Sequence, residues 1–119
     1  MNLIDTHAHL NELEDLEAAL QRARQTGVSK IVTIGMDLES NHRTLELAAR
    51  FPGEVHPAIG YHPWSIEAEQ VDANLAFIAE NLWHCVALGE IGLDYRAKAK
   101  KPLQWEVLAR LLPIARASG

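Results

Sequence analysis

The feature that most constrains the fold is a regular alternation between short apolar runs and longer segments with apolar side chains at helical spacing. The runs are residues 3–4, 30–35, 55–60 and 85–89. Within residues 31–34 and 85–88 every side chain is apolar or favours β structure, which is typical of strands covered on both faces. Strands that alternate with helices form parallel sheets through right-handed crossovers. The sequence therefore predicts an α/β domain with a parallel sheet and the order βαβαβαβα.

Each apolar run is followed by a segment that we expect to be a helix. In the first segment an apolar stripe begins at Leu13 and continues at steps of three and four residues. We expect Asn11 to cap this helix and Ser40 to cap the second one. The third helix should open at Asp72, and Pro102 suits the first turn of the fourth.

The length of the chain limits this sheet to one domain. With 119 residues, the chain falls well below the size at which domains usually split, so we expect a single domain over residues 1–119. Four βα units of about 30 residues match the amount of chain per unit in a (β/α)8 barrel of about 250 residues. The same units would suffice for a complete small open sheet. Periodicity leaves both alternatives open, a parallel (βα)4 half of a TIM-type barrel and an open sheet.

Composition and charge exclude several functional classes. The chain carries 11 Lys and Arg against 16 Asp and Glu, a formal charge of −5, which argues against binding nucleic acid mainly through a basic face. Bound metal cations would still allow contact with phosphate. No apolar run approaches the roughly 20 residues that span a bilayer, no signal peptide is visible, and the single cysteine, Cys85, suits a reducing compartment. We expect a cytoplasmic protein without membrane contact.

The first group of residues that suggests chemistry closes the first predicted strand. Asp5, His7 and His9 alternate along it, so their side chains should point to the same face. Two imidazoles on one face can bind one divalent ion, and Asp5 could accept a ring N–H and orient one of them. The alternative is a pair of hydrogen-bonded histidines at a strand end, and we favour metal binding.

A second group follows the fourth predicted strand directly. Glu90 closes this apolar strand, and a carboxylate there is costly unless a metal ion or a cationic side chain partners it. Gly89 and Gly92 allow a tight exit from the strand. Their spacing does not match a dinucleotide-binding fingerprint. Because the carboxyl ends of parallel strands meet at one edge, Glu90 should lie on the same edge as the histidines.

A third, weaker signal follows the third predicted strand. His62 should emerge at the same edge, and Trp64 could stack on a base or a sugar, although ordinary loop packing explains both equally well. We expect Trp83 and Trp105 to pack between helices. Cys85 is interpreted as a buried small side chain rather than a nucleophile.

The three groups together resemble a known family. The segments D-T-H-A-H-L at residues 5–10, G-Y-H-P at 60–63 and G-E-I-G-L-D-Y at 89–95 are similar, in order and spacing, to those of the TatD family of metal-dependent deoxyribonucleases. The H-x-H element is shared with the wider amidohydrolase superfamily, whereas the third segment is more particular to TatD proteins. The resemblance covers the whole chain but only the amino-terminal half of the family's usual length.

This resemblance implies a (β/α)8 barrel that binds one or two divalent metal ions, Mg, Mn or Zn, at its carboxyl-terminal mouth. It implies hydrolysis of phosphodiesters in DNA, often from a 3′ end, with a metal-activated water as the nucleophile. Carried over to this sequence, His7, His9 and Glu90 would be metal ligands, with Glu90 also the catalytic residue that bridges toward a second ion. His62 and Asp94 would bind the substrate near its phosphate.

The chain departs from the family because it stops at Gly119, before two histidines and an aspartate that complete the family's site. A shortened, non-catalytic half-barrel that only binds metal is therefore an alternative function, and C–N or ester hydrolysis of a small substrate is another. An isolated half-barrel also has two open sheet edges that invite self-association. In a two-fold dimer, we expect Glu90 of one copy to meet His7 and His9 of the other.

Overall fold

A computed structural model describes all residues, 1–119, and contains one sheet of four parallel strands. These are β1 (Leu3–Ala8), β2 (Val28–Ile34), β3 (Val55–Ile59) and β4 (Ala87–Leu88). They are hydrogen-bonded in the order β1-β2-β3-β4, which is also their order in the sequence. The sheet curls into a half-barrel, so the half-barrel expectation is confirmed.

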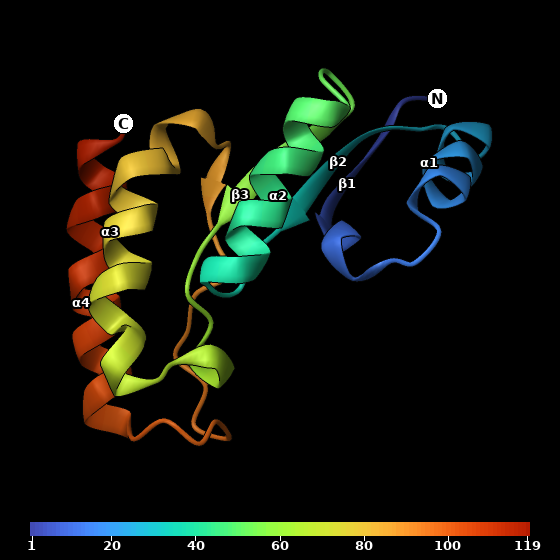
Figure 1. Cartoon of the computed structure of the whole chain (residues 1–119). Coiled ribbons are helices and arrows are strands. Elements are labelled where there is room, and N and C mark those ends of the chain that lie inside the picture. The colour runs from blue at the N-terminus through green and yellow to red at the C-terminus, as the bar shows by residue number, and fades with distance from the viewer.

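Four helices connect and follow the strands. They are α1 (Leu16–Gln25), α2 (Leu38–Arg50), α3 (Val71–Asn81) and α4 (Lys101–Ala117), with short 3₁₀ turns at Leu10–Glu12, Pro63–Ser65, Ala68–Gln70 and Leu82–His84. Figure 1 shows α3 and α4 side by side at one end of the molecule, α2 in the middle and α1 at the other end. None of these helices has the length and apolar character that crossing a bilayer requires.

Two helices begin at caps that differ from the expected ones. Asp15 caps α1, since its carboxylate accepts a hydrogen bond from the backbone N–H of Ala18. The expected cap, Asn11, lies inside the 3₁₀ turn Leu10–Glu12, which delays the start of the helix. Asp37 caps α2, and Ser40 is its reciprocal partner three residues later. Ser40 thus belongs to a capping box, but not at the cap position.

The core of the domain consists of two apolar clusters. The larger one packs β3 against α3 and α4, and Ile59, Ile78, Val107 and Leu111 are almost completely buried in it. The smaller one joins α1, β2 and β3 through Leu20, Ile31 and Val55, and Ala8 of β1 packs against it. Both clusters hold the strands from the helix side, so the carboxyl ends of β1, β3 and β4 keep fixed positions relative to one another.

The outer strands are less covered than the sequence suggests. Side chains of β1 are largely exposed, including Ile4, and Val86 beside β4 is exposed as well. The expectation of a strand covered on both faces is therefore wrong for residues 85–88, because helices pack on only one side of the curled sheet. Trp83 and Trp105 are also exposed rather than packed between helices.

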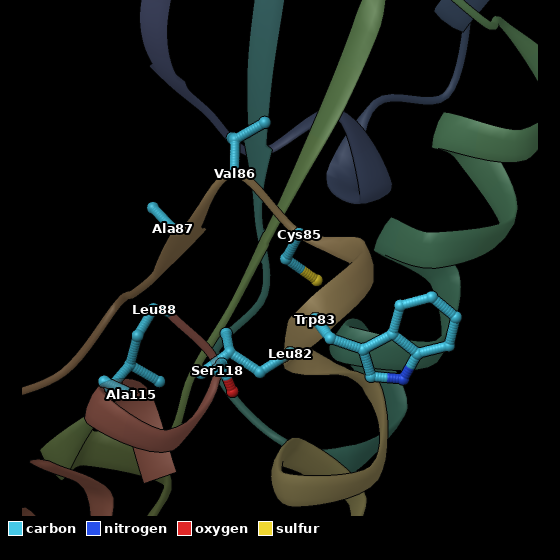
Figure 2. A pocket seen from close by; sticks show the side chains of 9 residues that line it. Leu82, Trp83, Cys85, Val86, Ala87, Leu88, Ala115 and Ser118 are labelled. Carbon is cyan, nitrogen blue, oxygen red and sulfur yellow. The ribbon is translucent and has the colours of Figure 1, made fainter. Parts of the chain in front are cut away.

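A small apolar hollow lies beside β4, near the last turn of α4 (Figure 2). Its volume is about 150 Å³, and seven of its nine lining residues are hydrophobic, among them Val86, Leu88 and Ala115. No histidine or acidic side chain lines it, so it is separate from the polar residues described below. Cys85 lies on its wall (Figure 2) and contacts the Asn81 carbonyl oxygen through its sulfur, at 3.5 Å.

We expect Cys85 to react slowly with thiol reagents. Burial raises the pKa of its thiol to about 11, which leaves on the order of 100-fold less thiolate at pH 8 than in an ordinary cysteine. The rate of reaction with a chromogenic disulfide, measured in the native state and in guanidinium chloride, checks this. Because Cys85 is the only cysteine, equal rates in the two states would contradict a protected thiol.

Candidate metal centre

Three potential metal ligands from distant parts of the sequence meet at the carboxyl edge of the sheet. His7 and His9 come from the end of β1, and Glu90 follows β4. One ligand atom from each of the three lies within 4.8 Å of the others. The Nε2 atoms of His7 and His9 lie 3.6 and 3.5 Å from the same oxygen, Glu90 Oε2. Glu90 therefore contacts the two histidines of its own chain.

The ring of His9 is held in one orientation. Its Nδ1 lies 3.2 Å from the carbonyl oxygen of Ile34, at the end of β2. A carbonyl oxygen can only accept a hydrogen bond, so Nδ1 carries the proton and donates it. The lone pair of Nε2 then faces Glu90. A backbone carbonyl on the far nitrogen of a histidine is the arrangement commonly found for metal ligands.

Asp5 occupies a different role from the expected one. Its Oδ1 accepts a hydrogen bond of 3.0 Å from the backbone N–H of His7 and contacts neither imidazole ring. The expectation that Asp5 orients a ring is therefore corrected. The carbonyl of Ile34 does this for His9, because β2 pairs directly with β1 and ends beside the His9 ring.

His62 approaches the same carboxylate from the turn after β3. Its Nδ1 accepts a hydrogen bond of 3.1 Å from the backbone N–H of Trp64, so the proton of the neutral ring is on Nε2. Nε2 lies 3.4 Å from Glu90 Oε1. The side chain of His62 is only 13 % exposed, against 53 % for His7. Three imidazoles thus surround Glu90, and no lysine or arginine pairs with it.

Glycines bring the Glu90 segment against the turn that carries His62. A Cβ on Gly60 would lie 2.6 Å from the carbonyl oxygen of Glu90, and one on Gly92 would collide with the ring of Pro63. The backbone N–H of Glu90 also donates to the carbonyl of Gly35, at 3.1 Å. The segments 60–63 and 89–95 therefore pack closely against each other, and we call this contact the junction.

Two buried polar residues that the sequence analysis did not single out support this junction. The amide of Asn41 donates to the carbonyl of Gly60 and accepts from its N–H, at 2.8 and 3.1 Å. The amide of Gln104 bonds both backbone groups of Asp94, at 3.0 and 2.9 Å. Both residues fall on the apolar face of a helix, which is the signal that could have identified them, since a polar side chain there needs specific partners.

The carboxylate of Asp94 accepts hydrogen bonds from two neighbouring residues. Its Oδ2 accepts a hydrogen bond of 2.8 Å from the indole N–H of Trp64, and its Oδ1 accepts one of 2.9 Å from the backbone N–H of Arg96. The Arg96 backbone and guanidinium hydrogen bonds, together with the Trp64 bond, hold the pKa of this carboxyl below its usual value. Asp94 therefore fixes the positions of Trp64 and Arg96.

These groups surround an open hollow of about 560 Å³. Its lining residues are His9, Glu12, Met36, His62, Trp64, Glu90, Asp94 and Arg96. Two imidazole nitrogens and a carboxylate oxygen converging at its edge form a donor set that suits a divalent metal ion, and three protein ligands leave coordination positions open. The hollow is large enough for a phosphate group beside such an ion.

Comparison with known proteins identifies the family of this chain. Residues 4–119 match the family described as TatD related DNase. The chain is 37 % identical over 121 residues to an uncharacterized metal-dependent hydrolase, YabD, of Bacillus subtilis, covering 96 % of this chain and 46 % of that protein. It is 33 % identical over 99 residues to a protein named 3′-5′ ssDNA/RNA exonuclease TatD from Yersinia pseudotuberculosis, covering 79 % of this chain and 36 % of that one.

A solved structure shows the same fold. The crystal structure of YjjV, a TatD homologue from Escherichia coli K12, superposes with a TM-score of 0.79 at 32 % identity and covers 98 % of this chain. Only 47 % of the YjjV chain is matched, and the present chain spans about half the length of the curated relatives it matches. With the family match, the relatives and the half-barrel in agreement, the chain belongs to the TatD family of metal-dependent hydrolases.

Proposed function

We propose that residues 1–119 form a single half-barrel domain that hydrolyses phosphodiester bonds of DNA with a divalent ion held by His7, His9 and Glu90. The observation that carries this proposal is the surrounding of Glu90 by three imidazoles without any lysine or arginine partner. Imidazole nitrogens and a carboxylate oxygen at these distances are suited to share one divalent cation as ligands. Relatives named deoxyribonuclease or exonuclease support DNA as the substrate.

His9, His62 and Asp94 have separate parts in this mechanism. A divalent ion bound here would supply positive charge to the phosphate and lower the pKa of water. His9 would hold such an ion through Nε2, because Ile34 holds its Nδ1 proton. His62 keeps a proton on Nε2, and this N–H can donate to a phosphate oxygen. Asp94 acts on the substrate through Trp64 and Arg96, which it positions.

The donor set favours some metals over others. Imidazole and carboxylate together suit Zn²⁺ and Mn²⁺, whereas Mg²⁺ prefers oxygen ligands. We therefore propose Zn²⁺ or Mn²⁺ as the preferred ion, bound first at His7, His9 and Glu90. Self-association through the open edges of β1 and β4 stays a prediction, since the structure contains a single copy.

Metal removal and re-addition test the proposed function. We expect the chain to hydrolyse a single-stranded oligonucleotide and a chromogenic phosphodiester, to lose both activities in EDTA, and to regain them with Zn²⁺ or Mn²⁺. Hydrolysis is measured by product release, and metal binding by calorimetry on the same preparation. Activity that is unchanged after complete metal removal would contradict the proposal.

A second function, metal binding without turnover, is favoured by one observation. Only three side chains of the described residues form a candidate ligand group, so a second ion would have few protein ligands here. Calorimetric binding of Zn²⁺ without hydrolysis of either phosphodiester would support this function. Turnover of an ester or amide substrate in place of both phosphodiesters would support the third alternative.

A further inference from the structure

A large aromatic side chain stands exposed at the edge of the candidate metal centre. Trp64 lies in the turn Pro63–Ser65 and is 62 % exposed, although indole is among the side chains that gain most from burial. It lines the same hollow as His9, His62 and Glu90. Its ring meets that of His62 edge to face, with centroids 5.7 Å apart and planes at 90°. An exposed tryptophan beside a catalytic centre is suited to contact a ligand.

The indole of Trp64 is exposed but not free to rotate. Its N–H donates to Asp94 Oδ2 at 2.8 Å, and its backbone N–H donates to His62. Asp94 is in turn held by Gln104, which is only 2 % exposed. A buried amide thus holds the backbone of Asp94, and the carboxylate of Asp94 holds the ring. Such an arrangement costs little conformational entropy when a flat ligand stacks on the ring.

Positive charge gathers beside this ring. A second hollow, of about 360 Å³, is lined by Trp64, Arg96, Ala97 and Lys98, and it shares Trp64 and Arg96 with the hollow of the metal centre. Residues 96–101 contain four of the chain's lysines and arginines and no acidic residue, although the whole chain carries a charge of −5. Arg96 contacts Asp94, whereas Lys98 forms no ion pair.

Tyr95 is a weaker candidate for a stacking surface. The ammonium of Lys101 lies 4.4 Å from the centre of its ring, and its hydroxyl accepts a hydrogen bond from the indole N–H of Trp105. One face of Tyr95 is therefore already covered by a cation. Trp64 has no cation over its ring, and Arg96 and Lys98 line a hollow together with it.

We propose that Trp64, Arg96 and Lys98 form a subsite for one unpaired nucleotide of a single-stranded nucleic acid. The base stacks on the indole of Trp64, and Arg96 and Lys98 contact the adjacent phosphate. This inference deepens the proposed function and rests on it, because the subsite delivers a strand to the metal centre through the shared hollow. Stacking on a fixed aromatic ring accepts any base, while bases inside a duplex have their faces covered by neighbours.

Binding without turnover tests the subsite. The probe is a fluorescein-labelled thymidine octamer, followed by fluorescence anisotropy in EDTA so that no hydrolysis occurs. We expect Trp64→Ala to weaken binding by about 5- to 150-fold, which corresponds to the loss of one base–aromatic stack of 1–3 kcal/mol. Trp64→Phe should restore most of the affinity because it keeps an aromatic face. Trp83→Ala is the matched control, since Trp83 is 66 % exposed and lines the separate apolar hollow.

Two further measurements distinguish contacts to the base from contacts to the phosphates. An octamer of abasic residues carries the phosphates without bases, so Trp64→Ala should not change its binding. Lys98→Ala should weaken the binding of both octamers equally and reduce the dependence of binding on salt by about one phosphate contact. Arg116→Ala, at the last turn of α4, is the control and should change neither the affinity nor its salt dependence. Circular dichroism of each variant shows that the fold is retained.

The results separate this inference from the proposed function. Equal binding of the thymidine octamer by Trp64→Ala and Trp83→Ala, or no binding by the unaltered chain, would overturn the subsite. Hydrolysis of the small chromogenic phosphodiester, which has no base to stack, reports on the metal centre alone. Trp64-dependent binding without any metal-dependent hydrolysis would retain the subsite and reject the proposed function.

Discussion

Replacing Glu90 with glutamine should abolish metal-dependent hydrolysis while the chain remains folded. Glu90 is the group on which His7, His9 and His62 converge, and an uncharged amide there removes the only carboxylate of the ligand group. Loss of groups that merely support metal ligands costs about 10- to 100-fold, so loss of the ligand itself should reduce metal affinity and activity by more than 100-fold. Calorimetry with Zn²⁺ and the rate of chromogenic phosphodiester hydrolysis measure the two effects.

The matched control for this change is Glu46→Gln. Glu46 is exposed on α2 and forms no ion pair, so the same change in charge should leave metal affinity and rate as they are. Thermal unfolding of both variants shows whether either one loses stability. If Glu90→Gln bound Zn²⁺ as tightly as the unaltered chain, Glu90 would not be a metal ligand.

Replacing Gly60 with alanine should both destabilise the fold and weaken the metal centre. The added Cβ would lie 2.6 Å from the Glu90 carbonyl oxygen and 2.7 Å from the Glu90 nitrogen. Both are backbone atoms, so the segment that carries Glu90 must move away. Inserting a methyl group into packed structure typically costs 1–3 kcal/mol, and we expect a loss of about that size in the free energy of unfolding. Urea denaturation measures the loss, and calorimetry with Zn²⁺ measures the displaced ligand.

A neighbouring glycine offers the control. A Cβ on Gly89 would meet no atom within 4 Å, and neither Gly60 nor Gly89 has a positive φ. Gly89→Ala should therefore change the free energy of unfolding much less than Gly60→Ala. If the two variants were equally stable, close packing would not be the reason for a glycine at position 60.

Much of the fold followed from local patterns in the sequence. The alternation of apolar runs and helical segments predicted parallel strands, and parallel strands place His9 and Glu90 at one edge whatever the details of packing. Helix starts were less predictable, because the turn at Leu10–Glu12 and the reciprocal pair Asp37 and Ser40 move the caps by a few residues. Exposure of the strand at residues 85–88 was missed, since residue type does not report which face a helix covers.

The sequence by itself determined which chemical groups stand at the carboxyl edge of the sheet. The succession of strands and helices along the chain, and the alternation of side chains along a strand, are local properties. Only the tertiary structure decided how those groups face one another. The Ile34 carbonyl selects the proton position on His9, and the contact of Gly60 with the Glu90 backbone sets where the carboxylate lies. Gln104 determines the position of Asp94, and through it the orientation of Trp64. These contacts join residues far apart in the chain, and their directions depend on how the segments pack.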